Sequence, residues 1–79
     1  MSRRKATLDI GYRAAEELYK LFPKNKAAAT AIGCDRKAIR FWELGCAPDA
    51  IHLQRLAFLG VDVHYVLTGI RKERRNGTE

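Results

Sequence analysis

Three cationic side chains, Arg36, Lys37 and Arg40, lie close together in one short run of the chain. Arginine and lysine can donate hydrogen bonds to O6 and N7 of guanine, and an arginine in the plane of the base makes two such bonds. At helical spacing these cations face away from Ile39 and Trp42, which share another side. The run therefore predicts a helix with an apolar face for the protein interior and a cationic face for a DNA groove.

The chain also holds four residues of metal-binding type, Cys34, Cys46, His52 and His64. Compact zinc sites pair their ligands about two to five residues apart, and none of these gaps matches that pattern. We therefore predict no metal and no cofactor. Because paired carboxylates, a Cys-His arrangement and a glycine-rich phosphate loop are also missing from the sequence, it does not favour an enzyme.

Length and charge indicate the class of protein. The chain has 79 residues, enough for one small domain, and a net charge of +6. A small domain this basic commonly meets nucleic acid or an anionic membrane surface, although a basic surface can also serve solubility alone. No apolar run approaches the roughly 18–20 residues that span a bilayer, and the first residues do not resemble a signal peptide. We expect a cytoplasmic protein without a membrane partner, with its cysteines as free thiols.

Hydrophobic spacing predicts helices separated by short breaks. Apolar residues recur at helical intervals between Ile10 and Leu21, which predicts a first helix. Thr7 or Asp9 can cap its start. Pro23 ends it, because proline lacks an amide proton and disfavours helix at the residue before it.

The second and third helices flank a tight turn. Asn25 can cap a helix over about residues 26–32, where several alanines favour helix and allow close approach. Gly33 can take the left-handed conformation that ends this helix. Asp35 then caps a third helix over about residues 36–44.

Two further helices complete the predicted domain. Pro48 or Asp49 starts a fourth helix that reaches towards Gly60, and Asp62 caps a short fifth helix that Gly69 stops. Five helices with short connections and no strand candidate predict an all-α fold. We expect residues 8–70 to form the domain, residues 1–7 to be a flexible basic arm and residues 71–79 to be a charged, disordered tail.

The spacing of small and apolar residues around the turn is typical of a helix-turn-helix. Two crossing helices need a small residue at the crossing, here Ala29, a permissive turn residue, Gly33, and apolar anchors beneath. This run, NKAAATAIGCDRKAIRFWELG, and the later LQRLAFLGVDVHYVLTG together resemble the Cro and phage-repressor domains of the xenobiotic-response-element family, over about residues 12–70. The resemblance implies a compact five-helix, lambda-repressor-like fold.

The resemblance assigns DNA contacts to particular positions. In that family the second helix of the motif lies in the major groove, so Arg36, Lys37 and Arg40 match base-facing positions. Phe41 departs from the polar residue usual there; it either touches the bases or completes the core, and we favour the DNA-facing role. Contacts to the DNA backbone are predicted for two groups of residues: Lys24, Asn25 and Lys26 at the second helix, and Arg3, Arg4 and Lys5 in the arm.

Glu43 is an acidic residue close to these cations in sequence. The resemblance implies a structural ion pair between Glu43 and a basic residue of the first helix, either Arg13 or Lys20. An exposed pair of this kind contributes only about 0–1 kcal/mol. Trp42, beside it, is expected in the core rather than stacked on bases, because it shares a face with Ile39.

The C-terminal part of the domain predicts a homodimer. Val63, Tyr65, Val66 and Ile70 exceed what a short terminal segment needs for docking, and related domains often dimerise through this region. The alternative is that such residues only close the core. A two-fold dimer would place two recognition helices about 34 Å apart, one turn of DNA.

Together these features predict a sequence-specific, double-stranded DNA-binding transcriptional regulator. We expect a repressor of phage, mobile-element or autoregulated bacterial promoters, binding a palindromic operator through residues 36–44, with no small-molecule effector. The alternative is an antitoxin or adaptor that acts mainly through protein contacts. Such an adaptor would need an exposed apolar patch.

Overall fold

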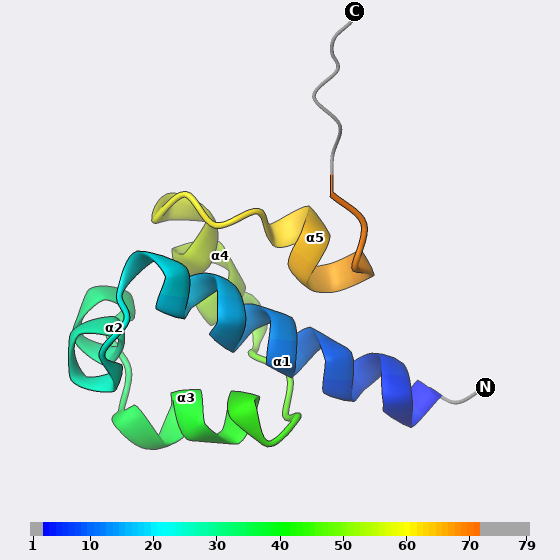
Figure 1. Cartoon of the computed structure of the whole chain (residues 1–79), viewed down its shortest axis with the longest axis horizontal. Helices are drawn as coiled ribbons and strands as arrows, with labels where there is room; N and C mark the ends of the chain where they lie inside the picture. Colours follow the sequence, from blue (N-terminus) through cyan, green and yellow to red (C-terminus); the bar gives the residue numbers. More distant parts are fainter. Residues whose placement is uncertain (1–2, 72–79) are drawn as a thin grey trace, which may run out of the picture.

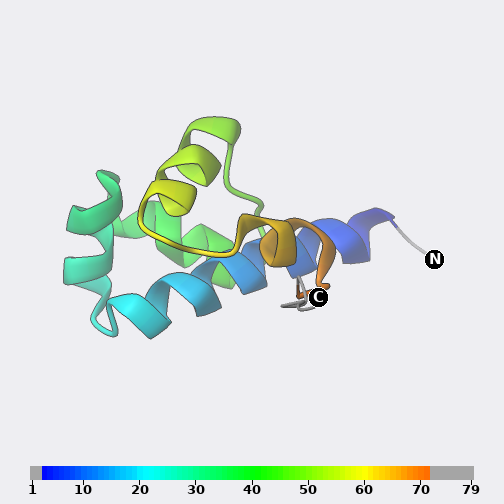
Figure 2. The same ribbon diagram turned by 90° about the horizontal axis from the view of Figure 1, so that it is seen from above.

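The computed structural model describes the backbone of residues 3–71 and the side chains of residues 9–71. This part of the chain contains five helices and no strand, so the predicted all-α fold is confirmed. The helices are α1 (Arg3–Leu21), α2 (Asn25–Ile32), α3 (Arg36–Glu43), α4 (Ala50–Phe58) and α5 (Val63–Thr68). In Figure 1 the long helix α1 crosses the centre, with α3 on one side and α4 and α5 on the other. Figure 2 shows α2 at one end of α1 and the N-terminus at the other.

The start of α1 differs from the prediction. The helix begins at Arg3, not near Thr7 or Asp9, so residues 3–7 of the expected flexible arm are helical. These residues include neither glycine nor proline and are rich in arginine, lysine and alanine, which are good helix formers, so nothing in them stops the helix. Residues 1 and 2 of the expected arm lie outside the described residues.

The later helices begin and end where local signals predict. Asp49 caps α4, because its carboxylate accepts a hydrogen bond from the His52 amide at 2.9 Å. Asp62 caps α5 in the same way, with the Tyr65 amide at 3.0 Å. Gly69 then ends α5 in the left-handed conformation, with φ of 79°. The predicted Asp62 and Gly69 boundaries are confirmed, and Asp49 rather than Pro48 is the residue that caps the start of α4.

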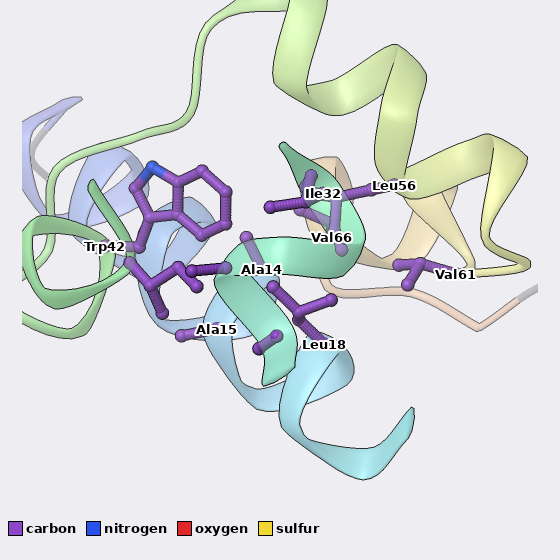
Figure 3. Packing of buried hydrophobic residues seen from close by; sticks show 11 residues of the cluster. Ala14, Ala15, Leu18, Ile32, Trp42, Leu56, Val61 and Val66 are labelled. Carbon is purple, nitrogen blue, oxygen red and sulfur yellow. The ribbon is translucent and has the colours of Figure 1, made fainter. Parts of the chain in front are cut away.

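Small and branched side chains from every helix form one core (Figure 3). Its fully buried members are Ala14, Leu18, Ala28, Ile32, Ile39, Leu56 and Val66, and Trp42 is almost completely buried beside them. Burying one leucine, isoleucine or valine side chain stabilises a fold by about 1.5–3 kcal/mol. The core therefore fixes α3 through Ile39 and Trp42, as the sequence predicted.

Gly11 allows α1 to approach the chain that follows α3. A Cβ atom at this position would lie 2.9 Å from the carbonyl oxygen of Trp42 and even closer to that of Cys46. Both neighbours are backbone atoms, which cannot rotate away. Hydrophobic spacing gives no signal for this contact, and the sequence analysis missed it.

Charged side chains and one tyrosine connect α1 with α5 and with the residues directly after it. We call this place the α1–α5 junction, and it comprises Arg13, Glu17, Lys20, Tyr65 and Arg71. Glu17 is only 7% exposed and accepts two hydrogen bonds from the Arg71 guanidinium, at 2.9 and 3.1 Å. Lys20 forms a second ion pair with Glu17 at 2.9 Å. The Arg71 guanidinium also lies 3.8 Å from the centroid of the Tyr65 ring. The hydrogen bonds from Arg71 are the main cause that lowers the pKa of Glu17.

The position of Arg71 corrects the prediction for the C-terminus. Residues 71–79 were expected to be a disordered tail, but Arg71 is anchored on Glu17 by two hydrogen bonds. Sequence alone could not show this, because the two residues are 54 positions apart. The rest of the predicted tail, residues 72–79, lies outside the described residues.

Candidate nucleic-acid interface

The turn between α2 and α3 has the geometry that the sequence predicts for Gly33. This residue is left-handed, with φ of 74°, and its amide bonds back to the carbonyl oxygens of Ala29 and Thr30. The Cys34 amide also reaches the Ala29 oxygen, at 3.0 Å. These bonds satisfy carbonyl groups that a helix end otherwise leaves unpaired and fix the direction in which α3 leaves the turn.

Arg55 provides a second restraint on this turn that the sequence analysis missed. From α4, its Nη1 atom donates to the carbonyl oxygens of Ile32 and Gly33, at 3.2 and 3.0 Å. Arg13 acts similarly on the last turn of α5, donating from Nε to the Val66 oxygen at 2.9 Å. A cation at a helix C-terminus is favoured by the helix dipole and by direct hydrogen bonding.

The two faces of α3 have the predicted characters. Ile39 and Trp42 point into the core. Arg36, Lys37 and Arg40 are exposed, and within the described part of the chain no ion pair involves them. The cations that the sequence assigns to base contacts are therefore presented together on one surface.

Phe41 belongs to the outward surface of α3 and not to the core. Its side chain is 53% exposed, which excludes the core role that the sequence left open. Together with the neighbouring Leu44, which is 71% exposed, it adds apolar area to the surface formed by the cations. Apolar side chains in a major groove can contact the methyl group of thymine. The sequence analysis missed Leu44 as an exposed residue of this surface.

A chain of hydrogen bonds connects Arg36 to the end of α1. Arg36 donates from Nε to Asn25 Oδ1 at 2.7 Å, and Asn25 donates from Nδ2 to the Tyr19 hydroxyl oxygen at 3.0 Å. The Tyr19 hydroxyl in turn donates to Glu43 Oε2 at the other end of α3. Burial raises the pKa of Tyr19, so its hydroxyl remains protonated at neutral pH. We call these four residues the Tyr19 relay.

The implied ion pair between Glu43 and Arg13 or Lys20 is not formed, so this prediction is wrong. Neither Arg13 nor Lys20 contacts it: Lys20 pairs with Glu17, and Arg13 reaches the carbonyl groups at the end of α5. Glu43 bonds instead to Tyr19. The reason is positional, since the residue of α1 that faces the end of α3 is a tyrosine, while these two cations point towards other partners.

Asn25 is not the cap of α2 that the sequence predicted. It is the first residue of α2, Lys24 occupies the cap position, and no side chain caps the helix. The Asn25 side chain is turned to Tyr19 and Arg36 and so cannot fold back on the amides of α2. Lys24 and Lys26 are exposed at this end of the helix, where the first amides lack helical acceptors. Contact of these residues with DNA phosphates stays a prediction. The same holds for Arg3, Arg4 and Lys5, whose side chains lie outside the described ones.

The predicted dimer residues do not lie on one surface. Val66 is completely buried, so its assignment to an interface is wrong; it is the residue of α5 that packs into the core. Val63 is half-buried against the same core. Tyr65 is covered on its ring by Arg71. Ile70, by contrast, is 64% exposed, and Leu67, three residues earlier in the chain, is also exposed.

The residues of metal-binding type are dispersed. His52 lies against Asp49, with 2.7 Å between Nδ1 and Oδ1, and its ring packs edge-on against Trp42. Cys34 is half-buried at the helix turn and Cys46 is exposed. Within the described residues, no three side chains of His, Cys, Asp or Glu come together as a metal site. The absence of a metal remains a prediction.

Comparison of the chain with protein-family models, with curated proteins and with solved structures found no match. None of the helices described is long and apolar enough to cross a membrane. The chemistry of the α3 surface is therefore the feature of this molecule that points to a function.

Proposed function

We propose that this protein is a sequence-specific, double-stranded DNA-binding transcriptional regulator with a lambda-repressor-like helix-turn-helix, whose helix α3 enters the major groove. One observation supports this most directly. Arg36, Lys37 and Arg40 project from a helix whose opposite face is buried, and no carboxylate among the described residues pairs with them. Cations without carboxylate partners on a rigid helix can neutralise phosphates and donate to base edges.

The proposed complex uses the surface of α3 in two ways. The three cations donate to guanine O6 and N7, while Phe41 and Leu44 contact thymine methyl groups or the sugar edge. Lys24 and Lys26, at the start of α2, bind phosphates that flank the groove and set the register. Helix α1 begins with Arg3, Arg4 and Lys5, which add phosphate contacts. Bound at a promoter, the protein represses by occlusion.

Selection from a pool of random DNA duplexes tests this function, with the parent chain and with single alanine substitutions of Arg36, Lys37 and Arg40. We expect the parent to select a motif and each substitution to relax the preference at particular base pairs, at a cost of about 1–3 kcal/mol. If all three variants select the parent's motif unchanged, α3 is not the reading helix. Lys20→Ala, within the α1–α5 junction and outside α3, serves as a control for loss of one positive charge.

We further propose that two copies pair on a palindromic operator through Leu67 and Ile70. These residues are exposed and lie at the end of α5 and directly after it. Ile70→Glu would place a charge in the apolar contact. We expect this variant to remain folded but to sediment as a monomer at concentrations where the parent is a dimer. A parent that remains monomeric on its operator rules out the pairing.

An antitoxin or adaptor role is the second candidate, and α4 carries the observation that favours it. Phe58 is 79% exposed, and Ile51, two helical turns earlier, is exposed on the same side of the helix. A partner protein that covers these two residues would leave α3 free for DNA. Phe58→Ser should then abolish binding of the partner while DNA binding persists.

A further inference from the structure

The Tyr19 relay links a residue of α1, Tyr19, to Arg36 on α3, the side chain proposed to contact a base. We propose that Tyr19 is a positioning residue for base recognition: it sets the orientation of Asn25 and, through Asn25, the donors that Arg36 presents to a base. This inference rests on the proposed function, and it adds a specificity-determining residue on a helix that does not contact the base.

The direction of every hydrogen bond in the relay follows from chemistry. A carboxylate only accepts, so the Tyr19 hydroxyl must donate its single proton to Glu43. The hydroxyl oxygen then has only acceptor capacity left, so it is the NH₂ group of Asn25 that faces Tyr19. The amide oxygen of Asn25 consequently faces Arg36, which can only donate. Reversing the amide would place two donors against each other at Arg36.

The relay also selects which donors of Arg36 remain for DNA. A guanidinium has five N–H groups, and the Nε–H group is used by Asn25 at 2.7 Å. The two terminal nitrogens, Nη1 and Nη2, are left to form a pair of bonds with O6 and N7 of guanine. A freely rotating Arg36 could also use Nε with one terminal nitrogen or bind a phosphate. The restraint therefore favours guanine at the base pair that Arg36 reads.

The arrangement is pre-formed, because its four residues join three helices. Tyr19 is near the end of α1, Asn25 begins α2, and Arg36 and Glu43 are the first and last residues of α3. Positioning Arg36 before DNA arrives lowers the conformational entropy lost on binding, which for a long side chain is substantial.

Tyr19→Phe is the test, because it removes the hydroxyl and keeps the ring. The control is Tyr12→Phe, which removes a hydroxyl from the exposed tyrosine of the same helix. Each full-length variant is used in selection from random duplexes. The dissociation constant is then measured for the selected operator and for a variant operator changed at the base pair where Arg36→Ala loses its preference. The readout is the dissociation constant of the variant operator divided by that of the selected operator. Loss of protein stability alone affects both constants equally and leaves this ratio unchanged.

We expect Tyr19→Phe to lower this ratio about three- to tenfold, the equivalent of one hydrogen bond, and Tyr12→Phe to leave it unchanged. Combined with Arg36→Ala, Tyr19→Phe should have no further effect at that base pair, because the relay acts only through Arg36. Asn25→Ala interrupts the relay at its second member and should relax the same base pair, so it decides the question if Tyr19→Phe fails to fold. An unchanged ratio in the folded variants overturns the relay while the proposed function stands. A parent that selects no motif overturns both.

Discussion

The outer face of α3 and the α1–α5 junction are both rich in charge, yet they use it in opposite ways. At the junction Glu17 is buried and paired with Arg71 and Lys20. On α3 the cations Arg36, Lys37 and Arg40 have no ion-pair partner among the described residues. The same residue types thus stabilise tertiary structure in one region and remain available for a polyanion in the other.

Burial explains this contrast. A carboxylate that is mostly removed from water needs cations and hydrogen bonds to compensate for lost solvation, and Glu17 obtains both from Arg71. Exposed cations have no such requirement, so α3 can hold three of them close together without neutralising them. Their mutual repulsion is screened by salt, and in the proposed complex phosphates would relieve it.

The largest expected effect comes from Gly11, whose substitution would disturb both regions because α1 packs against both α3 and α5. Replacing glycine by alanine inside a helix normally stabilises it by about 1 kcal/mol. Here the added methyl would clash with the backbone after α3, so we expect Gly11→Ala to destabilise by about 3 kcal/mol. Urea denaturation measures this. Gly60→Ala is the control: its Cβ would meet nothing within 4 Å, so only its left-handed backbone opposes the change. A stabilised Gly11→Ala protein would contradict the close approach.

A charge-matched pair of variants would separate the two regions directly. Arg40→Gln and Arg71→Gln each remove one positive charge, so long-range attraction to DNA falls equally. We expect Arg40→Gln to weaken operator binding by about 1–3 kcal/mol with an unchanged Tm. Arg71→Gln should lower Tm and leave specific binding close to that of the parent, because it loses contacts with Glu17 and Tyr65. Equal losses of affinity in both variants would show that only net charge matters.

The smallest effect concerns pH. Because the pKa of Glu17 is lowered in the folded state, its contribution to stability is complete above the ordinary pKa of 4.5 that it has in the unfolded chain. The contribution is lost as pH falls through the lower, folded pKa. Glu17→Gln should destabilise by only about 0.5–1 kcal/mol at pH 7, since the partner cations are well solvated. The variant should also lose less stability than the parent between pH 5 and pH 3. If the stabilities of the variant and the parent fall in parallel over this range, Glu17 does not contribute to the pH dependence of stability.

Much of the fold could be predicted from the sequence, because its signals are local. Asp49 and Asp62 cap helices through amides three residues ahead, and Gly33 and Gly69 end helices through their own backbone conformation. The division of α3 into buried and exposed faces follows from the period of the helix, as Ile39 and Trp42 show. These features need no partner distant in sequence. The predicted N-terminal boundary of α1 was wrong for a related reason. Capping residues mark where a helix can begin, but good helix formers before them can extend the helix further.

What only the tertiary structure decided involves partners that are far apart in the chain. Glu43 is bonded to Tyr19 rather than to a cation, Arg71 is anchored on Glu17, and Val66 is buried rather than free for a dimer. Residue types alone allow each of these groups several partners; the packing of helices selects one. The three cations of α3 could thus be identified from the sequence, whereas the hydrogen bonds that orient Arg36 required three helices to be placed together, because hydrogen bonds need atoms within about 3 Å.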